Sequence, residues 1–240
     1  GRRGASSGAR SRSLGELRIP SPMSRPALAL VMREVLRRNR IRDGIIYIQM
    51  TRGVAPRDHA VPKHALKTAV VMTARRKKPQ AAALAERGAK VITIPDIRWE
   101  RCDIKAVALL PNVLGKQQAV EAGAFEAWQV GADGLITEGT STNAWIVTDK
   151  NELVTRQTGP EILNGVTRLA VMALARERQL KLVERPFSVA EAKAAKEAFL
   201  TSTTSAVLPV VAIDDVAVAD GKPGPLTRAL RDYYFAHAAG

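Results

Sequence analysis

Short apolar segments typical of β-strands are interleaved with amphipathic helices along most of the chain, and this mixture limits the fold more than any other feature. The segments follow no regular β–α alternation, so we expect an α+β fold rather than a parallel, doubly wound sheet. Strands between 126 and 155 are expected to pair antiparallel. Beyond residue 79 the expected strands are 90–94, 126–130, 143–148, 152–155, 181–185, 198–201 and 206–213, and the expected helices are 81–87, 113–122, 166–179, 189–196 and 226–234.

The first third of the chain is organised differently. Residues 1–13 contain only Gly, Arg, Ala and Ser, so no side chain there can anchor a core, and we expect poor order. A helix is expected after Ser24 as its N-cap, followed by a buried strand at 45–51 and a second strand at 69–73. The basic run at 75–79 is the best linker. The predicted divisions of the chain are therefore 1–13, 14–78 and 79–240.

Positive charge is concentrated in this first third. The chain has 37 Lys and Arg against 23 Asp and Glu, a net charge of +14. Residues 1–78 hold 19 basic and 4 acidic residues, and the remaining 162 hold 18 and 19. A basic arm on a neutral body is one cue for nucleic-acid binding. Only 4% of residues are aromatic, which leaves little for base stacking, so we rank nucleic acid last among the partners considered.

Composition excludes several other classes of protein. No segment approaches the roughly 20 apolar residues needed to span a bilayer, and the start lacks the apolar core of a secretory signal. The single cysteine, Cys102, excludes an intramolecular disulfide and a multi-cysteine zinc site. The three histidines are scattered and give no metal signature. We therefore expect a cytoplasmic protein with no metal and no membrane partner.

Lys105 is the first candidate for chemistry, because the apolar run 106–111 follows it directly. Removing the amine from water disfavours its ammonium form, and a neutral amine can attack a carbonyl group. The alternative is a lysine whose stem lies on apolar surface while its amine stays in water. The pattern alone favours this alternative.

Glu138 is the second candidate, since it lies between an apolar strand and a Gly-Thr-Ser-Thr turn. A buried carboxylate there could keep a cofactor ring nitrogen protonated, whereas a cap or turn residue is the ordinary explanation. Two further segments could bind phosphate. Residues 164–167 open the strongest helix, whose free N–H groups attract anions, and residues 201–205 supply a cluster of hydroxyl groups.

Arg57 and His59 lie two residues apart in the loop that follows strand 45–51. In an extended loop they point to the same side, and a guanidinium there can bind a carboxylate through two parallel hydrogen bonds. An ordinary surface loop, with Asp58 neutralising Arg57, is the better explanation of this segment taken alone.

Four separated motifs occur in one order: TRGVAPRDH at 51–59, RCDIK with LLPNVLGKQ at 101–117, ITEGTSTN at 136–143, and ILNGVTR with TSTTS at 162–168 and 201–205. Together they resemble the fold-type IV pyridoxal-phosphate aminotransferases, and most closely the D-amino-acid (D-alanine) branch. The resemblance covers the chain from about Leu17 to Tyr234. It implies an α+β, two-domain homodimer, with a small N-terminal domain over 14–78 and a large cofactor-binding domain over 79–240.

The resemblance also implies the reaction and its residues. Pyridoxal 5'-phosphate (PLP) would be the cofactor, Lys105 its Schiff-base lysine and the acid/base, Glu138 the partner of the pyridine nitrogen, and Leu163 a packing contact for the ring. The reaction would be transamination between a D-amino acid and a 2-oxo acid such as 2-oxoglutarate. Arg57 and His59 would bind the substrate carboxylate across the dimer interface. The residues implied for the phosphate are Val166, Thr167, Ser202 and Thr203.

The start of the chain departs from the family pattern. The resemblance implies a phosphate-binding Arg and an active-site Tyr in this part, and residues 1–13 have no counterpart of the Tyr. Arg10 or Arg12 could substitute for the Arg, although neither aligns well. We therefore expect the small domain to be incomplete, through a frame error or a misplaced start upstream of Leu14.

Other functions remain open at this point. A branched-chain L-amino-acid aminotransferase and an aminodeoxychorismate lyase share the fold and the Lys–Glu pair, and only Arg57 and His59 favour the D-amino-acid branch. A truncated chain could also be a weakly active or inactive remnant.

Overall fold

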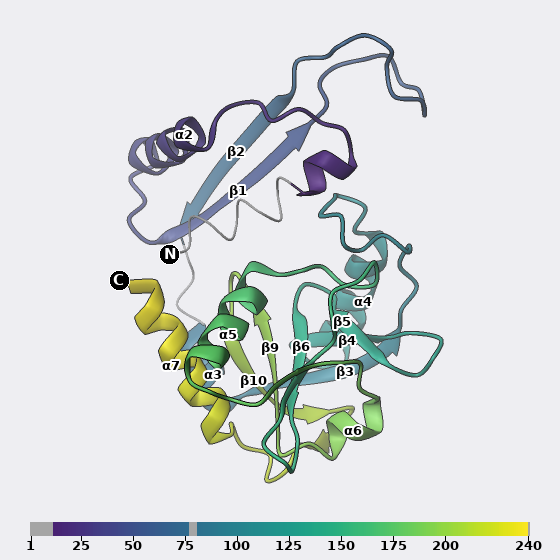
Figure 1. Ribbon diagram of the computed structural model, residues 1–240, viewed down its shortest axis with the longest axis vertical. Helices are drawn as coiled ribbons and strands as arrows, with labels where there is room; N and C mark the ends of the chain where they lie inside the picture. The colour runs from purple at the N-terminus through teal and green to yellow at the C-terminus, as the bar shows by residue number, and fades with distance from the viewer. Residues whose placement is uncertain (1–11, 77–80, 240) are drawn as a thin grey trace. The chain divides into compact units, whose positions relative to one another are not determined.

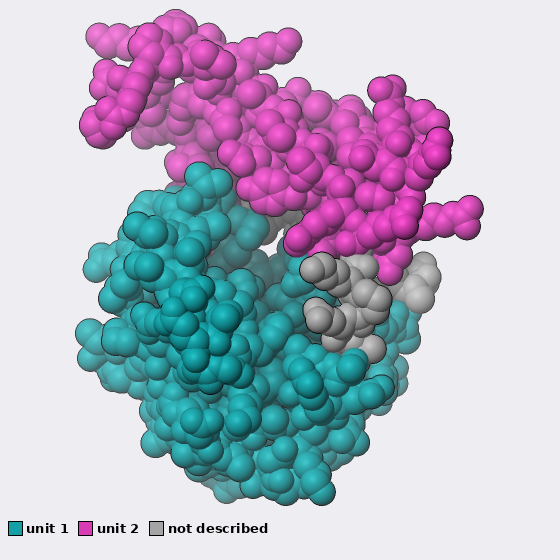
Figure 2. Space-filling view, turned by 180° about the vertical axis from the view of Figure 1, so that it is seen from behind, with its two compact units in different colours: residues 1–9, 80–240 teal, residues 10–79 magenta. Residues whose placement is uncertain are grey.

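The computed structural model describes residues 12–76 and 81–239. These residues form two compact units, one within 10–79 and one within 80–240, which Figure 2 colours separately. Residues 1–11 of the segment expected to be poorly ordered lie outside the described residues, as do residues 77–79 of the linker expected at 75–79. Residues 75 and 76 of that linker belong to a strand. Residues 12 and 13 belong to a helical turn that runs to residue 16. Among the described residues, no helix is both long and apolar enough to cross a membrane.

The unit within 10–79 contains helix α2 (Arg25–Arg38) and an antiparallel ribbon of β1 (Gly44–Thr51) and β2 (Ala69–Arg76). The predicted N-cap is confirmed, because the Ser24 hydroxyl accepts a hydrogen bond from the Ala27 N–H at 3.4 Å. The expectation of a buried strand at 45–51 is wrong. A two-stranded ribbon has few neighbours to cover it, so the β1 side chains are half-buried or exposed.

The unit within 80–240 is built on a nine-stranded sheet (Figure 1). Its strand order is β5-β4-β3-β10-β9-β6-β7-β8, and β11 pairs with β10. The strands are β3 (Ala89–Pro95), β4 (Glu126–Val130), β5 (Ile136–Gly139), β6 (Asn143–Val147), β7 (Leu153–Thr155), β8 (Leu182–Glu184), β9 (Glu197–Ser202), β10 (Ala206–Ile213) and β11 (Val216–Ala217). This mixed sheet and its helices confirm the α+β prediction.

Pairing within the sheet differs in one respect from the antiparallel set expected between 126 and 155. Strands β6 and β7 are antiparallel, as are β4 and β5, but β4 is parallel to β3 on its other side. Helix α4 (Leu110–Glu121) lies between β3 and β4 in the chain, and a parallel pair requires such a crossover connection. The helix begins three residues before the expected start because Pro111 is tolerated in its first turn.

The sheet curls back on itself. The Ile136 N–H on edge strand β5 donates to the Phe187 carbonyl at 2.9 Å, and an isolated bridge joins Leu135 to Ser188, just beyond the other edge strand, β8. This closure places β5 and β6, which are consecutive in the chain but not paired with each other, in the interior, where every residue of both strands is buried. Glu138 lies on β5 and Asn143 on β6.

Both faces of the central strands are covered by side chains. Trp145 and Phe199 stack with ring centroids 5.3 Å apart in the cluster formed with α5 (Val166–Glu177) and α7 (Pro225–Ala239). Figure 1 shows these two helices beside β9 and β10. Trp128 and Phe187 belong to the opposite cluster, which also contains residues of the short helices α3 (Ala81–Arg87) and α6 (Val189–Lys193). Burial on both faces explains the near-continuous apolar strands of the sequence.

Candidate active site

Glu138 is a buried carboxylate on strand β5. Its Oε2 accepts a hydrogen bond from the Asn143 side-chain amide at 2.9 Å and from the Leu163 N–H at 3.1 Å. Its Oε1 forms an ion pair with Nη1 of Arg98 at 2.6 Å. A buried charge needs such partners to offset its loss of hydration.

Arg98 and Asp96, which the sequence reasoning missed, complete a buried triad with Glu138. Asp96 accepts two parallel hydrogen bonds from Arg98, at 2.9 Å from Nε and at 2.7 Å from Nη2. The Thr137 hydroxyl donates to Asp96 at 2.7 Å. The Asp-x-Arg spacing after a buried strand was the available sequence signal for this pair. The partner of Arg98 on β5, Glu138, is 40 residues away in the chain.

The three ionisable groups of the triad shift the pKa values of one another. Burial raises the pKa of Glu138 to about 7, while the Arg98 guanidinium and the Leu163 N–H act in the opposite direction. Burial opposes ionisation of Asp96 as well, but hydrogen bonds from Arg98 and Thr137 outweigh it and lower the pKa of Asp96. Burial by itself would lower the pKa of Arg98. The interactions of Arg98 with Asp96 and Glu138 outweigh this effect and raise its pKa.

The protein without cofactor should lose stability as Glu138 ionises. The ordinary glutamate pKa is 4.5 and the native pKa is about 7, so between these values the native state holds one more proton than the unfolded state. The free energy of unfolding therefore falls with rising pH, and this contribution, about 3 kcal/mol, is present below pH 4.5 and lost by about pH 7. Urea unfolding of wild type and Glu138→Gln at about pH 4.5 and about pH 8 measures it. A pH dependence equal in the two proteins would contradict the assignment.

Asn143 connects Glu138 to the candidate phosphate segments. Its amide also donates to the Leu163 carbonyl at 2.9 Å, and a Cβ added to Gly165 would overlap its Oδ1. Gly165 is the N-cap of α5, and β6 residue Asn143 pairs with Thr201 on β9. The structure thus brings together Glu138, Leu163, the start of α5 and the end of β9.

The predicted phosphate residues lie at those two chain segments. Val166 and Thr167 are the first residues of α5, and Gly165 before them has no side chain to cap their N–H groups. Thr167 is buried, with its hydroxyl 3.4 Å from that of Tyr234. Ser202 ends β9 and accepts a hydrogen bond from the Ser205 N–H at 3.0 Å, while Thr203 is exposed in the following turn. A helix start beside hydroxyl groups can bind an anion.

Lys105 lies on the loop between β3 and α4, and its side chain is exposed. Residues 106–111 do not bury it, because most of those apolar side chains face solvent themselves, and this agrees with the exposed lysine that the pattern alone favoured. The loop is tied to the Glu138 region at both ends. Arg98 pairs with Glu138, and the Asn112 amide donates to the Thr140 carbonyl at 2.8 Å.

A second carboxylate that the sequence reasoning missed, Glu126, supports the turn between β5 and β6. It is fully buried and accepts hydrogen bonds from the hydroxyl groups of Thr140 and Ser141, the latter at 2.9 Å. The Gly-Thr-Ser-Thr sequence is thus a turn held from β4.

Arg57 and His59 belong to the other unit and lie in the loop between β1 and β2, where both are exposed. The Asp58 carboxylate accepts the His59 N–H at 2.6 Å. Their role in substrate binding stays a prediction.

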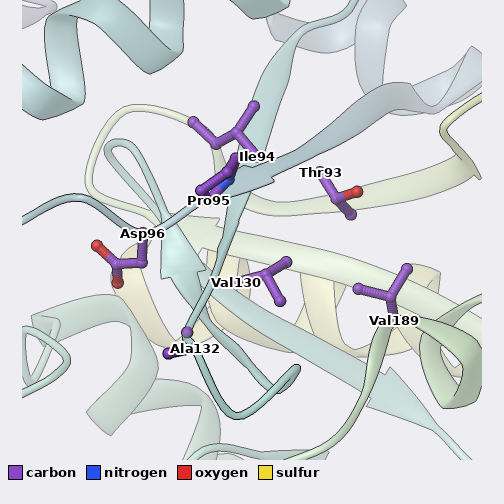
Figure 3. A pocket seen from close by; sticks show the side chains of 8 residues that line it. Thr93, Ile94, Pro95, Asp96, Val130, Ala132 and Val189 are labelled. Atoms are coloured by element: carbon purple, nitrogen blue, oxygen red, sulfur yellow. The ribbon is translucent and has the colours of Figure 1, made fainter.

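An open hollow of about 460 Å³ lies beside the triad (Figure 3). Thr93, Asp96, Val130 and Val189 are among its lining residues, and it includes none of the predicted site residues. The candidate site is therefore defined by the contacts around Glu138 and Asn143 rather than by this hollow. A buried carboxylate close to an open helix start and hydroxyl groups suits a ring with a basic nitrogen and a phosphate group.

Comparisons with known proteins agree with this chemistry. Residues 11–213 match the family model described as amino-transferase class IV. A D-alanine aminotransferase of Bacillus licheniformis is 41% identical over 217 residues, which are 90% of this chain and 75% of the relative. One of Staphylococcus haemolyticus is 39% identical over 221 residues, which are 92% and 77% of the two chains. The chain spans about three quarters of the length of these relatives.

Solved structures confirm the fold. The Escherichia coli branched-chain amino acid aminotransferase superposes with a TM-score of 0.86 at 23% identity, over 95% of this chain and 77% of that one. The Thermobaculum terrenum branched-chain aminotransferase in its PLP form superposes with a TM-score of 0.80 at 25% identity, over 97% of this chain and 77% of that one. The predicted family is confirmed, and this chain belongs to the class IV aminotransferases, which are PLP-dependent enzymes.

Proposed function

We propose that this chain catalyses PLP-dependent transamination between a D-amino acid of the D-alanine type and a 2-oxo acid such as 2-oxoglutarate. The observation that carries the proposal is the 38–41% identity, over at least 90% of the chain, to relatives named D-alanine aminotransferase. The branched-chain aminotransferases among the structural neighbours reach only 23–25% identity.

The residues around Glu138 fit the cofactor. Glu138 would face the pyridine nitrogen, Leu163 would pack against the ring, and Lys105 would hold the cofactor covalently through Nζ. The start of α5 leaves N–H groups without a side-chain cap for the phosphate. The hydroxyl groups proposed for the same phosphate are those of Thr167, Ser202 and Thr203.

Bound PLP supplies an electron sink for the negative charge that develops at the substrate Cα. The chain supplies the proton transfers. The Lys105 Nζ would take the proton from the substrate Cα as general base and return it as general acid. Glu138 would hold the proton on the ring nitrogen, because a buried carboxylate stabilises a cation more strongly than an exposed one.

Substrate binding and assembly form part of the proposal. Arg57 and His59 would bind the substrate carboxylate, and a second copy of the chain would supply them. Half of the exposed large hydrophobic side chains among the described residues lie between 97 and 120, and such clustering indicates a protein interface. They are Ile97, Trp99, Val107, Leu109, Leu110, Val113, Leu114 and Val120. The cytoplasmic location and the absence of a nucleic-acid partner stay predictions.

Two parallel assays test the substrate assignment. The purified chain, supplied with PLP, is given 2-oxoglutarate and either D-alanine or L-leucine, and glutamate formation is measured. We expect glutamate with D-alanine. Turnover with L-leucine alone would instead favour the branched-chain activity. Failure to bind PLP or to turn over either substrate would identify an inactive remnant.

A further inference from the structure

We infer that Asp96 and Arg98 form a positioning pair that favours the ionised form of Glu138 and fixes its orientation toward the cofactor ring nitrogen. The inference rests on the proposed function, because it gives this pair a task at the same site. Arg98 touches neither substrate nor reacting atoms in this assignment and acts through Glu138.

The contacts of Arg98 fix its guanidinium in place. Only 5% of the Arg98 side chain is exposed, and its donors are directed to four separate groups. Besides Asp96 and Glu138, Nη2 donates to the Glu161 carbonyl at 2.9 Å and contacts the Thr137 hydroxyl at 3.2 Å. A guanidinium is planar and rigid, so contacts on several sides fix its position. The single donor directed at Glu138, Nη1, is thereby fixed as well.

Asp96 sets the net charge of the triad. If Arg98 served Glu138 alone, the pair would be neutral, and a ring nitrogen would face no net charge. Asp96 takes two of the Arg98 donors and adds a second carboxylate, so the triad has two negative groups and one positive. The net charge of −1 is available to a protonated ring nitrogen. Asp96 therefore lets Arg98 hold the Glu138 carboxylate without cancelling its effect.

Arg98 also influences the protonation of Glu138. Fully buried carboxyl groups become neutral unless a cation or hydrogen-bond donors stabilise their charge. The groups that face Glu138 are Arg98, Asp96, the Asn143 amide and the Leu163 N–H, and Arg98 is the cation among them. Without Arg98, the nearby Asp96 charge and burial would both favour protonated Glu138, which cannot balance a positive ring nitrogen.

A double-mutant cycle separates this role from a purely structural ion pair. The variants are Arg98→Met, Glu138→Gln and the double variant, with Arg98→Lys as the charge-conserving form. Arg185→Met is the control, because it breaks an ion pair of Arg185 with Glu191 that lies outside the candidate site. PLP dissociation constants and the pH titration of the absorbance of bound PLP are measured, together with thermal unfolding.

We expect Arg98→Met to weaken PLP binding at least about tenfold and to shift the spectral titration, with partial recovery in Arg98→Lys. The double variant should bind no more weakly than Glu138→Gln, since Arg98 acts through that carboxylate. Additive losses, or a spectral titration unchanged in Arg98→Met, would overturn the inference.

The cofactor-free protein gives an independent measurement. In Arg98→Met the loss of stability caused by ionisation of Glu138 should move to higher pH than in wild type, and Glu138→Gln should abolish it. If wild type fails to bind PLP, the proposed function fails, while this pH shift still decides whether Arg98 controls the charge of Glu138. An unshifted transition would contradict that control.

Discussion

Replacing Lys105 with alanine is expected to reduce transamination by at least about 10³-fold, because the variant loses both the covalent attachment of PLP and the proton-transfer group. The rate of glutamate formation from D-alanine and 2-oxoglutarate measures the loss of activity. Borohydride reduction of the PLP-loaded protein followed by mass spectrometry measures the loss of covalent attachment. The wild type should carry one reduced adduct on Lys105, and the variant none.

The control is Lys150→Ala. Lys150 is an exposed lysine in the turn between β6 and β7, where its backbone N–H bonds to the Asp149 carboxylate at 2.9 Å. Its removal should leave activity and the adduct unchanged. The chain has twelve lysines. An adduct retained in Lys105→Ala at wild-type yield would place the attachment on one of the other eleven.

Features that depend on neighbouring residues were predictable from the sequence. The Ser24 cap acts over three residues, and α5 begins at Val166, where its apolar periodicity also begins. The ordered motifs identified the family for the same reason, since each motif is a short continuous segment. Local interactions of this kind depend on the residue types at nearby positions in the chain.

Contacts between distant segments were not predictable in the same way. The Arg98–Glu138 ion pair spans 40 residues, and its existence depends on the strand order β5-β4-β3, which brings β5 close to the loop after β3. Burial of a side chain also depends on spatial neighbours that are distant in the sequence. The strand at 45–51 and the run at 106–111 are both apolar, yet each has too little structure around it in the described chain to be covered.

The start of helix α7 shows how far such a non-local contact can control stability. Gly224 precedes the first helical residue, Pro225, and has no side chain to cap the helix. Glu197 on β9 supplies the missing cap. Its carboxylate accepts the Leu226 N–H at 3.0 Å, and the N–H and hydroxyl of Thr227 at 2.8 and 2.7 Å. This satisfies orphan donors of the first turn, and the negative charge lies at the favourable end of the helix dipole.

Gly224→Ala is therefore expected to destabilise the unit within 80–240 by about 3 kcal/mol or more. A Cβ at this position would overlap the Glu197 side chain, and its nearest atoms belong to the capping carboxylate. That carboxylate is buried and cannot swing into solvent, so it must give up hydrogen bonds that are worth about 1.5–3 kcal/mol each when one partner is charged. Calorimetry should show the transition of this unit lowered by roughly 6–12 °C.

Gly15→Ala is the matched control, because a Cβ there meets nothing within 4 Å. Glu197→Gln provides a second test of the same cap, since it keeps the shape of the side chain but replaces its charge and one of its acceptor oxygens. We expect Glu197→Gln also to lower the transition, and the two changes combined to cost less than their sum, because both act on one set of hydrogen bonds. A Gly224→Ala transition at the wild-type temperature would contradict this prediction and show that the cap tolerates displacement of the Glu197 side chain.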